Sequence, residues 1–87
     1  MFDIHKNILT IQEVKDFAKY LYSVHKVAFH PDNTFDVYIS SNNEKLFSKE
    51  EIEILNIRME ECFDVCNKYD QDIYELMGNE KKILYEA

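Results

Sequence analysis

Hydrophobic and polar positions follow helical spacing over two long stretches of the chain. Between residues 47 and 69, apolar side chains recur every three or four positions, as on one face of an α-helix. This apolar arc consists of Ile52, Leu55, Met59, Cys62, Phe63, Cys66 and Tyr69, with Ile54 and Val65 on its flank. The opposite side of the same helix is acidic and carries Glu50, Glu53, Glu60, Glu61 and Asp64. Ile57 falls within the acidic side.

The start of this helix is indicated by three local signals. Ser48 is a favoured N-cap residue, and Glu51 follows three positions later to complete a capping box. Phe47 and Ile52 have the spacing of a hydrophobic staple. The pattern therefore predicts one helix of about 20 residues, roughly 30 Å long, which could form a wall for the other elements.

An earlier stretch repeats the same start signals. Thr10 and Glu13 form a second candidate capping box, with Leu9 and Val14 as its staple. We expect a first helix from about Ile11 to about Lys26. Its apolar face is made by Ile11, Val14, Phe17, Ala18, Leu21, Val24 and Ala28, and its lysines are Lys15, Lys19 and Lys26.

The segment between these helices is ambiguous. Pro31 disfavours helix at the residue before it and indicates a turn. Residues 27–39 alternate as a short β-hairpin would, but Thr34 could equally cap a single helical turn. After the long helix, Asp70 is expected to cap a short third helix that ends before Gly78. The apolar residues 83–85 are expected to fold back on the core or to contact another subunit.

These patterns predict a mainly α fold in one compact domain over residues 1–87. Its frame is a helical hairpin of two long amphipathic helices, with a short third helix and the possible β-hairpin around residues 27–39. Apolar residues make up 46% of the chain, and one Gly and one Pro leave almost no flexible linker.

Charge restricts the kind of partner. The net charge is −7, and residues 44–87 hold twelve acids against six Lys or Arg. Such a balance argues against direct binding of nucleic acid, which needs clustered basic side chains. No window is long and apolar enough for a membrane span, and two cysteines are too few for a secreted disulfide framework. We therefore expect a cytoplasmic protein.

Few side chains are candidates for catalysis or metal binding. Cys62 and Cys66 lie one helical turn apart, but a zinc site needs further ligands and no local motif places a histidine beside them. We interpret both as small buried thiols. The acids lie on a helix exterior, and no nucleophile has a base at motif spacing. The sequence predicts no enzyme activity, cofactor or metal.

The tripeptide His30-Pro31-Asp32 resembles that of the J-domain co-chaperones, in which it lies in a loop after a helix. The resemblance implies stimulation of a chaperone ATPase. The J-domain pattern also requires a strongly basic preceding helix, which residues 14–29 do not reproduce. Hydrogen bonds within the turn account for the same three residues.

The order HPDNTF, then the helix that starts at Ser48, then DIYEL resembles that of small acidic proteins of unknown function from gut bacteria and their mobile elements. This resemblance implies a bacterial accessory protein, and it does not identify any site residues.

Two functional hypotheses follow. The first is a non-enzymatic protein–protein interaction module or regulator, with a homodimer as one possibility. The second is an acidic inhibitor that occupies the nucleic-acid site of a basic protein. Tyr20 and Tyr22 are expected to form an exposed or half-exposed aromatic pair, because they leave the apolar face of the first helix on either side. The predicted partner-binding residues are Glu53, Ile57, Glu60, Glu61, Asp64, Tyr20 and Tyr22.

Overall fold

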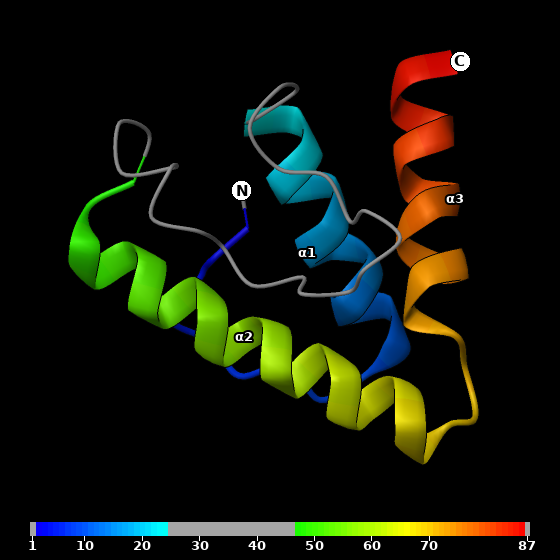
Figure 1. Ribbon diagram of the computed structural model, residues 1–87, viewed down its shortest axis with the longest axis horizontal. Helices are drawn as coiled ribbons and strands as arrows, with labels where there is room; N and C mark the ends of the chain where they lie inside the picture. The colour runs from blue at the N-terminus through cyan, green and yellow to red at the C-terminus, as the bar shows by residue number, and fades with distance from the viewer. Residues whose placement is uncertain (1, 25–46, 87) are drawn as a thin grey trace.

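The computed structural model describes residues 2–24 and 47–86, which form an N-terminal segment and three helices (Figure 1). The helices are α1 (Ile11–Val24), α2 (Lys49–Lys68) and α3 (Ile73–Glu86). No strand occurs within these two ranges, so the mainly α class is confirmed for them. The possible β-hairpin at residues 27–39 and the His30-Pro31-Asp32 tripeptide lie outside the described residues.

The predicted start of α2 is confirmed in detail. Ser48 is the N-cap with extended backbone angles, and its Oγ accepts a hydrogen bond of 3.1 Å from the Glu51 backbone N–H. In return, the Ser48 N–H donates to Glu51 Oε1 at 2.9 Å. Phe47 and Ile52 are both buried, as a hydrophobic staple requires. These paired bonds satisfy two backbone donors that the first helical turn leaves open.

The start of α1 matches the prediction only in part. The Glu13 N–H donates to Thr10 Oγ1 at 3.2 Å, but Glu13 Oε1 accepts from the Leu9 N–H and the Thr10 hydroxyl instead of the Thr10 N–H. The predicted staple is wrong, because Leu9 is 67% exposed whereas Val14 is fully buried. Neighbouring side chains of an extended segment point in opposite directions, so the burial of Ile8 turns Leu9 toward solvent.

The prediction that Asp70 caps the third helix is also wrong. Asp70 has φ +55° and forms the left-handed end of α2, where its N–H donates to the Asn67 carbonyl at 3.3 Å. The Gln71 N–H donates to the Cys66 carbonyl at 2.8 Å, which completes a Schellman motif. The cap of α3 is Asp72, whose Oδ1 accepts from the Tyr74 N–H at 2.9 Å.

Gly78 lies inside α3 and does not end it. The third helix was expected to be short, but its 14 residues equal the length of α1. A glycine within a helix costs about 1 kcal/mol relative to alanine, which packing against a neighbouring element readily outweighs. The local stop signal was therefore overridden by tertiary contacts.

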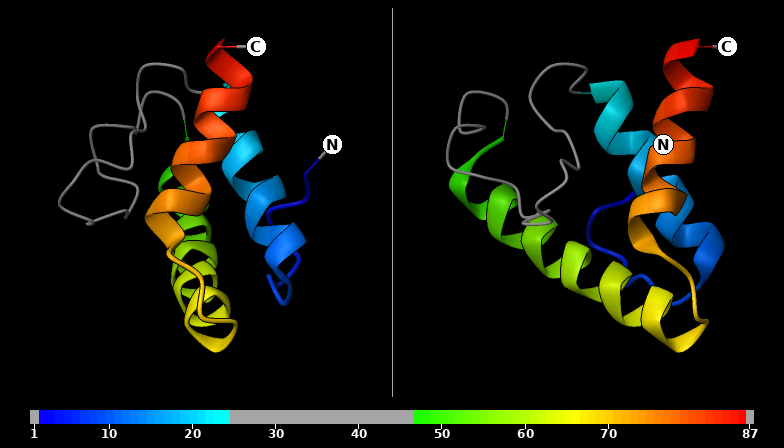
Figure 2. Two further views of the ribbon diagram at one scale, coloured as in Figure 1. Left: turned by 90° about the vertical axis from the view of Figure 1, so that its right-hand side faces the viewer. Right: turned by 45° about the vertical axis from the view of Figure 1, so that its right-hand side comes forward.

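The three helices alternate in direction, with α1 and α3 running side by side the same way and α2 crossing them (Figures 1 and 2). α1 packs more extensively along α3 than along α2. The expected hairpin of α1 and α2 is thus only part of the arrangement. Contact between α2 and α3 includes Phe63 and Tyr74, whose rings meet edge to face at 6.3 Å between centroids.

One core joins all three helices and the N-terminal segment. It contains Ile8, Val14, Phe17, Ala18, Leu21, Tyr22, Phe47, Ile52, Leu55, Met59, Cys62, Val65, Cys66, Ile73, Leu76 and Met77. Most of the predicted apolar positions of α1 and α2 are among them. Tyr69, which the helical spacing placed on the buried arc, is instead 48% exposed, because it lies at the C-cap where α2 ends.

Candidate functional site

The outer face of α2 carries most of the acids that the sequence singled out. Glu53, Glu60 and Asp64 are exposed, and Ile57 is 50% exposed between them. Because positions i−4, i+3 and i+7 lie close to position i on one side of a helix, these acids form a stripe that runs past the isoleucine. Glu50, at i−7, is exposed as well. We call the surface formed by Glu50, Glu53, Ile57, Glu60 and Asp64 the α2 outer face.

Glu61 has a different environment from the other predicted acids. Its Oε1 accepts hydrogen bonds from Arg58 Nη1 at 2.6 Å and from the Ile8 backbone N–H at 3.0 Å. The side chain is 26% exposed. Its carboxylate is therefore bound within the chain, where it holds the N-terminal segment against α2.

Arg58 is a residue that sequence reasoning did not identify. It is buried on α2, where its Nε donates to the Ile4 carbonyl at 2.9 Å and its Nη1 to Asn7 Oδ1 at 2.6 Å. Together with Glu61, it fastens residues 4–8 to α2. Its spacing could have identified it. Arg58 lies three residues after Leu55 and four before Cys62, so helical periodicity places this cation on the apolar arc.

The two tyrosines do not form the predicted exposed pair. Tyr20 is partly buried, but Tyr22 is completely buried in the core, so that part of the prediction is wrong. The physical reason is that α1 contacts both α2 and α3, which widens its buried arc beyond what a two-helix hairpin would cover. Burial raises the pKa of the Tyr20 hydroxyl, and the Glu51 carboxylate adds to this effect.

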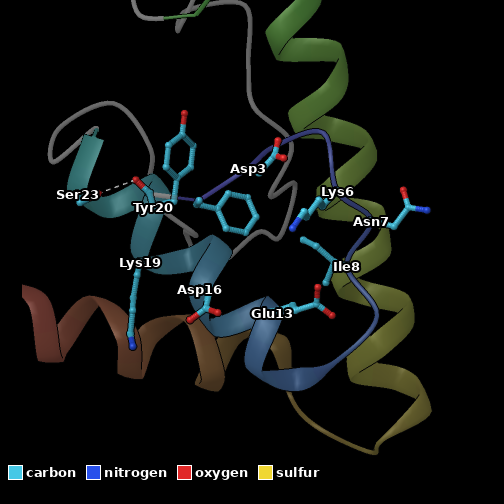
Figure 3. Close-up of a pocket in the computed structure, with 10 residues that line it drawn as sticks. Asp3, Lys6, Asn7, Ile8, Glu13, Asp16, Lys19, Tyr20 and Ser23 are labelled. Atoms are coloured by element: carbon cyan, nitrogen blue, oxygen red, sulfur yellow. Dashed lines mark hydrogen bonds between the residues drawn. The ribbon is translucent and has the colours of Figure 1, made fainter.

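Tyr20 contributes to an open groove of about 920 Å³ between the N-terminal segment and α1 (Figure 3). The Phe2 ring packs against Phe17 and Tyr20, with 5.4 Å between centroids in each pair. The lining residues are Phe2, Asp3, Lys6, Asn7, Ile8, Glu13, Asp16, Lys19, Tyr20 and Ser23. Its charged side chains are of both signs, and Figure 3 shows Lys19 pointing toward α3, away from Asp3 and Lys6. The groove therefore offers no convergent set of polar groups.

A second pocket, of about 340 Å³, lies between α1 and α3. We call it the α1–α3 pocket. It is lined by Lys15, Gln71, Asp72, Glu75, Leu76, Asn79, Glu80 and Ile83. Glu80 is only 5% exposed, and its Oε2 makes no hydrogen bond to the residues that the structure describes. The Nζ of Lys19 lies 3.9 Å from that oxygen.

Cys62 and Cys66 are buried and not joined in a disulfide, which confirms their interpretation as buried thiols. Burial raises the pKa of both, and Asp72 raises that of Cys66 further. Since the thiolate is the reactive form, both side chains are poor nucleophiles in the folded protein. Within the described ranges, no three His, Cys, Asp or Glu side chains are grouped as a metal site would require.

No helix within the described residues combines the length and the apolar character needed to cross a membrane. Neither a protein-family model, nor a curated protein, nor a solved structure matches the chain.

Proposed function

We propose that the chain is a small, non-enzymatic, cytoplasmic interaction protein that binds a basic protein partner through the α2 outer face. The observation that carries the proposal is the half-exposed Ile57 within a stripe of exposed acids on α2. Interfaces commonly combine an apolar anchor near the centre with charged groups around it. The resemblance to small acidic bacterial proteins is compatible with an accessory role of this kind.

The charge of this face favours a different protein over a second copy of the chain. In a twofold-symmetric dimer, the same patch faces itself, so Glu53, Glu60 and Asp64 of one copy would face the acids of the other. Like charges brought together at an interface repel one another and weaken the association. A partner with lysines or arginines around an apolar pocket would instead complement both the acids and Ile57.

Mimicry of nucleic acid is less well supported than binding of an ordinary basic surface. Glu61 is already paired with Arg58, which leaves Glu50, Glu53, Glu60 and Asp64 as the exposed acids of this face. They span about 21 Å of helix axis, or one charge per about 5 Å. Duplex DNA carries one charge per about 1.7 Å. The α2 outer face is therefore much less densely charged than the ligand it would replace.

Site-specific crosslinking in the native cells tests this proposal. A photocrosslinking amino acid at position 57 should capture one discrete partner protein, whereas the same group at Leu9, which is 67% exposed, should not. The captured protein should bind the purified chain with an affinity that falls as salt rises. Capture of a second copy of the chain alone, or no capture, would contradict the proposal.

Matched charge variants sharpen the test. The double variant E53Q/E60Q should weaken binding of the captured partner and reduce its salt dependence. D16N/E75Q removes the same number of exposed negative charges elsewhere and should leave binding nearly unchanged. If both variants bind equally, the α2 outer face is not the interface, and only overall charge matters.

A further inference from the structure

The exposed side chains of α2 lie in one narrow line. Between positions 50 and 64 the exposed residues are those of the α2 outer face, and every other residue in that range is buried or partly buried. With 100° of rotation per residue, the five exposed positions fall within an arc of about 80° around the helix axis. A stripe this narrow has the width of a coiled-coil seam, whereas a helix packs into a core by a wider face.

The spacing within this stripe is also that of a coiled coil. Its members follow one another at alternating intervals of three and four residues, which is the spacing of the a and d positions of a heptad repeat. Such a stripe drifts by only about 20° per heptad, so a second helix that crosses at about 20° can follow its whole length of about 21 Å. The geometry of the α2 outer face therefore suits a helix that lies lengthwise on α2.

An extended segment suits the stripe poorly. Side chains on one face of a strand repeat about every 6.6 Å, whereas those of the stripe repeat about every 5.3 Å along the helix axis. Over the four intervals of the stripe the difference reaches about 5 Å, which is a whole interval. An extended backbone also needs hydrogen-bond partners, and the backbone groups inside α2 are already paired within the helix.

The side chains of the stripe specify the surface of the helix that would face it. Ile57 is 50% exposed, and Ile54, almost one turn before it, is partly exposed as well. In coiled-coil packing, such a side chain enters the hole between four residues of the facing helix. Glu53 and Glu60 precede and follow Ile57 in the stripe, and both are exposed. The facing helix therefore needs an apolar centre with lysines or arginines on either side of it.

We infer that the partner presents a basic amphipathic α-helix and that this helix lies lengthwise along the α2 outer face. Its lysines or arginines face the acids of the stripe, and its apolar centre receives Ile57. The inference rests on the proposed function, because it specifies which kind of structure the basic partner brings to that surface.

Titration of the isotope-labelled protein with a designed helical peptide tests the inference. The peptide has about 20 residues, with leucines at the centre of one face and lysines on the same face at both ends. A control peptide has the same composition in an order that leaves the leucines and lysines on no common face. The ordered peptide should become more helical on binding and shift the amides of residues 50–64. Its dissociation constant should be on the order of 100 μM, and about tenfold or more below that of the control peptide.

Matched variants identify the contact. I57Q removes the apolar side chain from the stripe and should weaken binding of the ordered peptide about tenfold. L9Q makes a comparable change at Leu9, which is 67% exposed and lies outside α2, and should bind normally. Three results would each overturn the inference: equal affinity for the two peptides, no saturable shift at about 1 mM peptide, or equal binding by I57Q and the native protein.

Crosslinking separates this inference from the proposed function. With photocrosslinking groups placed in turn at positions 53, 57 and 60, the attachment points on the captured partner should advance by three or four residues along one helix. Attachment within a strand or a loop of a basic partner would overturn the inference and leave the proposed function intact. Failure to capture any partner would contradict the proposed function, and the peptide titration would then decide whether the α2 outer face binds a helix.

Discussion

Arg58 on α2 and Glu80 on α3 are both buried charged side chains, but their surroundings differ. Arg58 donates to Ile4, Asn7 and Glu61 at 2.6–2.9 Å, so that a carbonyl, an amide and a carboxylate surround its guanidinium. Glu80 has an oxygen without a hydrogen bond in the described residues and a cation no closer than 3.9 Å. Arg58 has hydrogen-bond partners that join two segments of the fold, whereas Glu80 is buried with one oxygen that has no hydrogen bond to the described residues.

The two residues contrast a buried charge that has its hydrogen-bond partners with a buried charge that lacks one. A buried charge with a complete set of partners stabilises the folded state only if all of the partners are present. A buried charge with an unpaired acceptor oxygen destabilises the folded state. Equivalent substitutions at the two positions should therefore change stability in opposite directions.

The largest expected effect is at Arg58. R58M should lower the free energy of unfolding by about 2–4 kcal/mol, because it leaves the Ile4 carbonyl and the Glu61 carboxylate without their cation. Urea denaturation measures the loss, and amide hydrogen exchange of residues 4–8 should rise along with it. K68M, which removes an exposed cation from the end of the same helix, is the control and should change little.

The same replacement at Glu80 should have the opposite sign. E80M should raise the free energy of unfolding by about 1–2 kcal/mol, since methionine fills a similar volume without a buried charge. Thermal unfolding and urea denaturation both measure the gain. A loss of more than about 1 kcal/mol would show that Glu80 is held by interactions comparable to those of Arg58, and the contrast between the two residues would fail.

A smaller gain is expected at Asp70. Its φ of +55° lies in the left-handed region, which costs a residue with a Cβ about 1 kcal/mol relative to glycine. D70G should stabilise the protein by up to that amount while it preserves the hydrogen bonds of the Schellman motif. D70A at the same position should give no gain, which separates backbone strain from removal of a negative charge.

The smallest expected effect is on the pKa of Glu51, which forms the capping box of α2 with Ser48. The Ser48 N–H and hydroxyl hold the pKa of Glu51 below its ordinary value. The stabilisation linked to Glu51 is therefore present above the unfolded-state pKa and is lost as the pH falls through the lower folded-state value. S48A keeps the backbone donor and removes the hydroxyl, so the Glu51 pKa should rise part of the way back. The pKa of Glu51 is measured from the pH dependence of its side-chain carboxyl NMR chemical shift.

Local interactions account for what the sequence predicted well. Ser48 and Glu51 are three residues apart, so their reciprocal hydrogen bonds depend on residue type and spacing alone. The apolar arcs of α1 and α2 follow from helical periodicity in the same way. For the candidate site, this local reasoning also identified Ile57 as an exposed apolar side chain among acids.

Contacts between distant segments account for what was missed. Gly78 and Asp70 carry plausible local signals for the end and the start of a helix, but α3 begins after Asp72 and continues through Gly78 along α1. The burial of Tyr22 depends on α1 having two helical neighbours. The partners of Arg58 in the N-terminal segment are more than 50 positions away in sequence, so no local pattern could have named them.

The attachment of the N-terminal segment also constrains the order of folding. Ile4 and Ile8 bind Arg58 and Glu61 across 54 and 53 positions of sequence, so these contacts close some of the longest loops in the described chain. Loop closure of this kind is slow relative to helix formation. During synthesis, residues 4–8 leave the ribosome well before α2 exists. Their apolar side chains therefore stay exposed until α2 has formed. Docking of this segment therefore reports that α2 has formed.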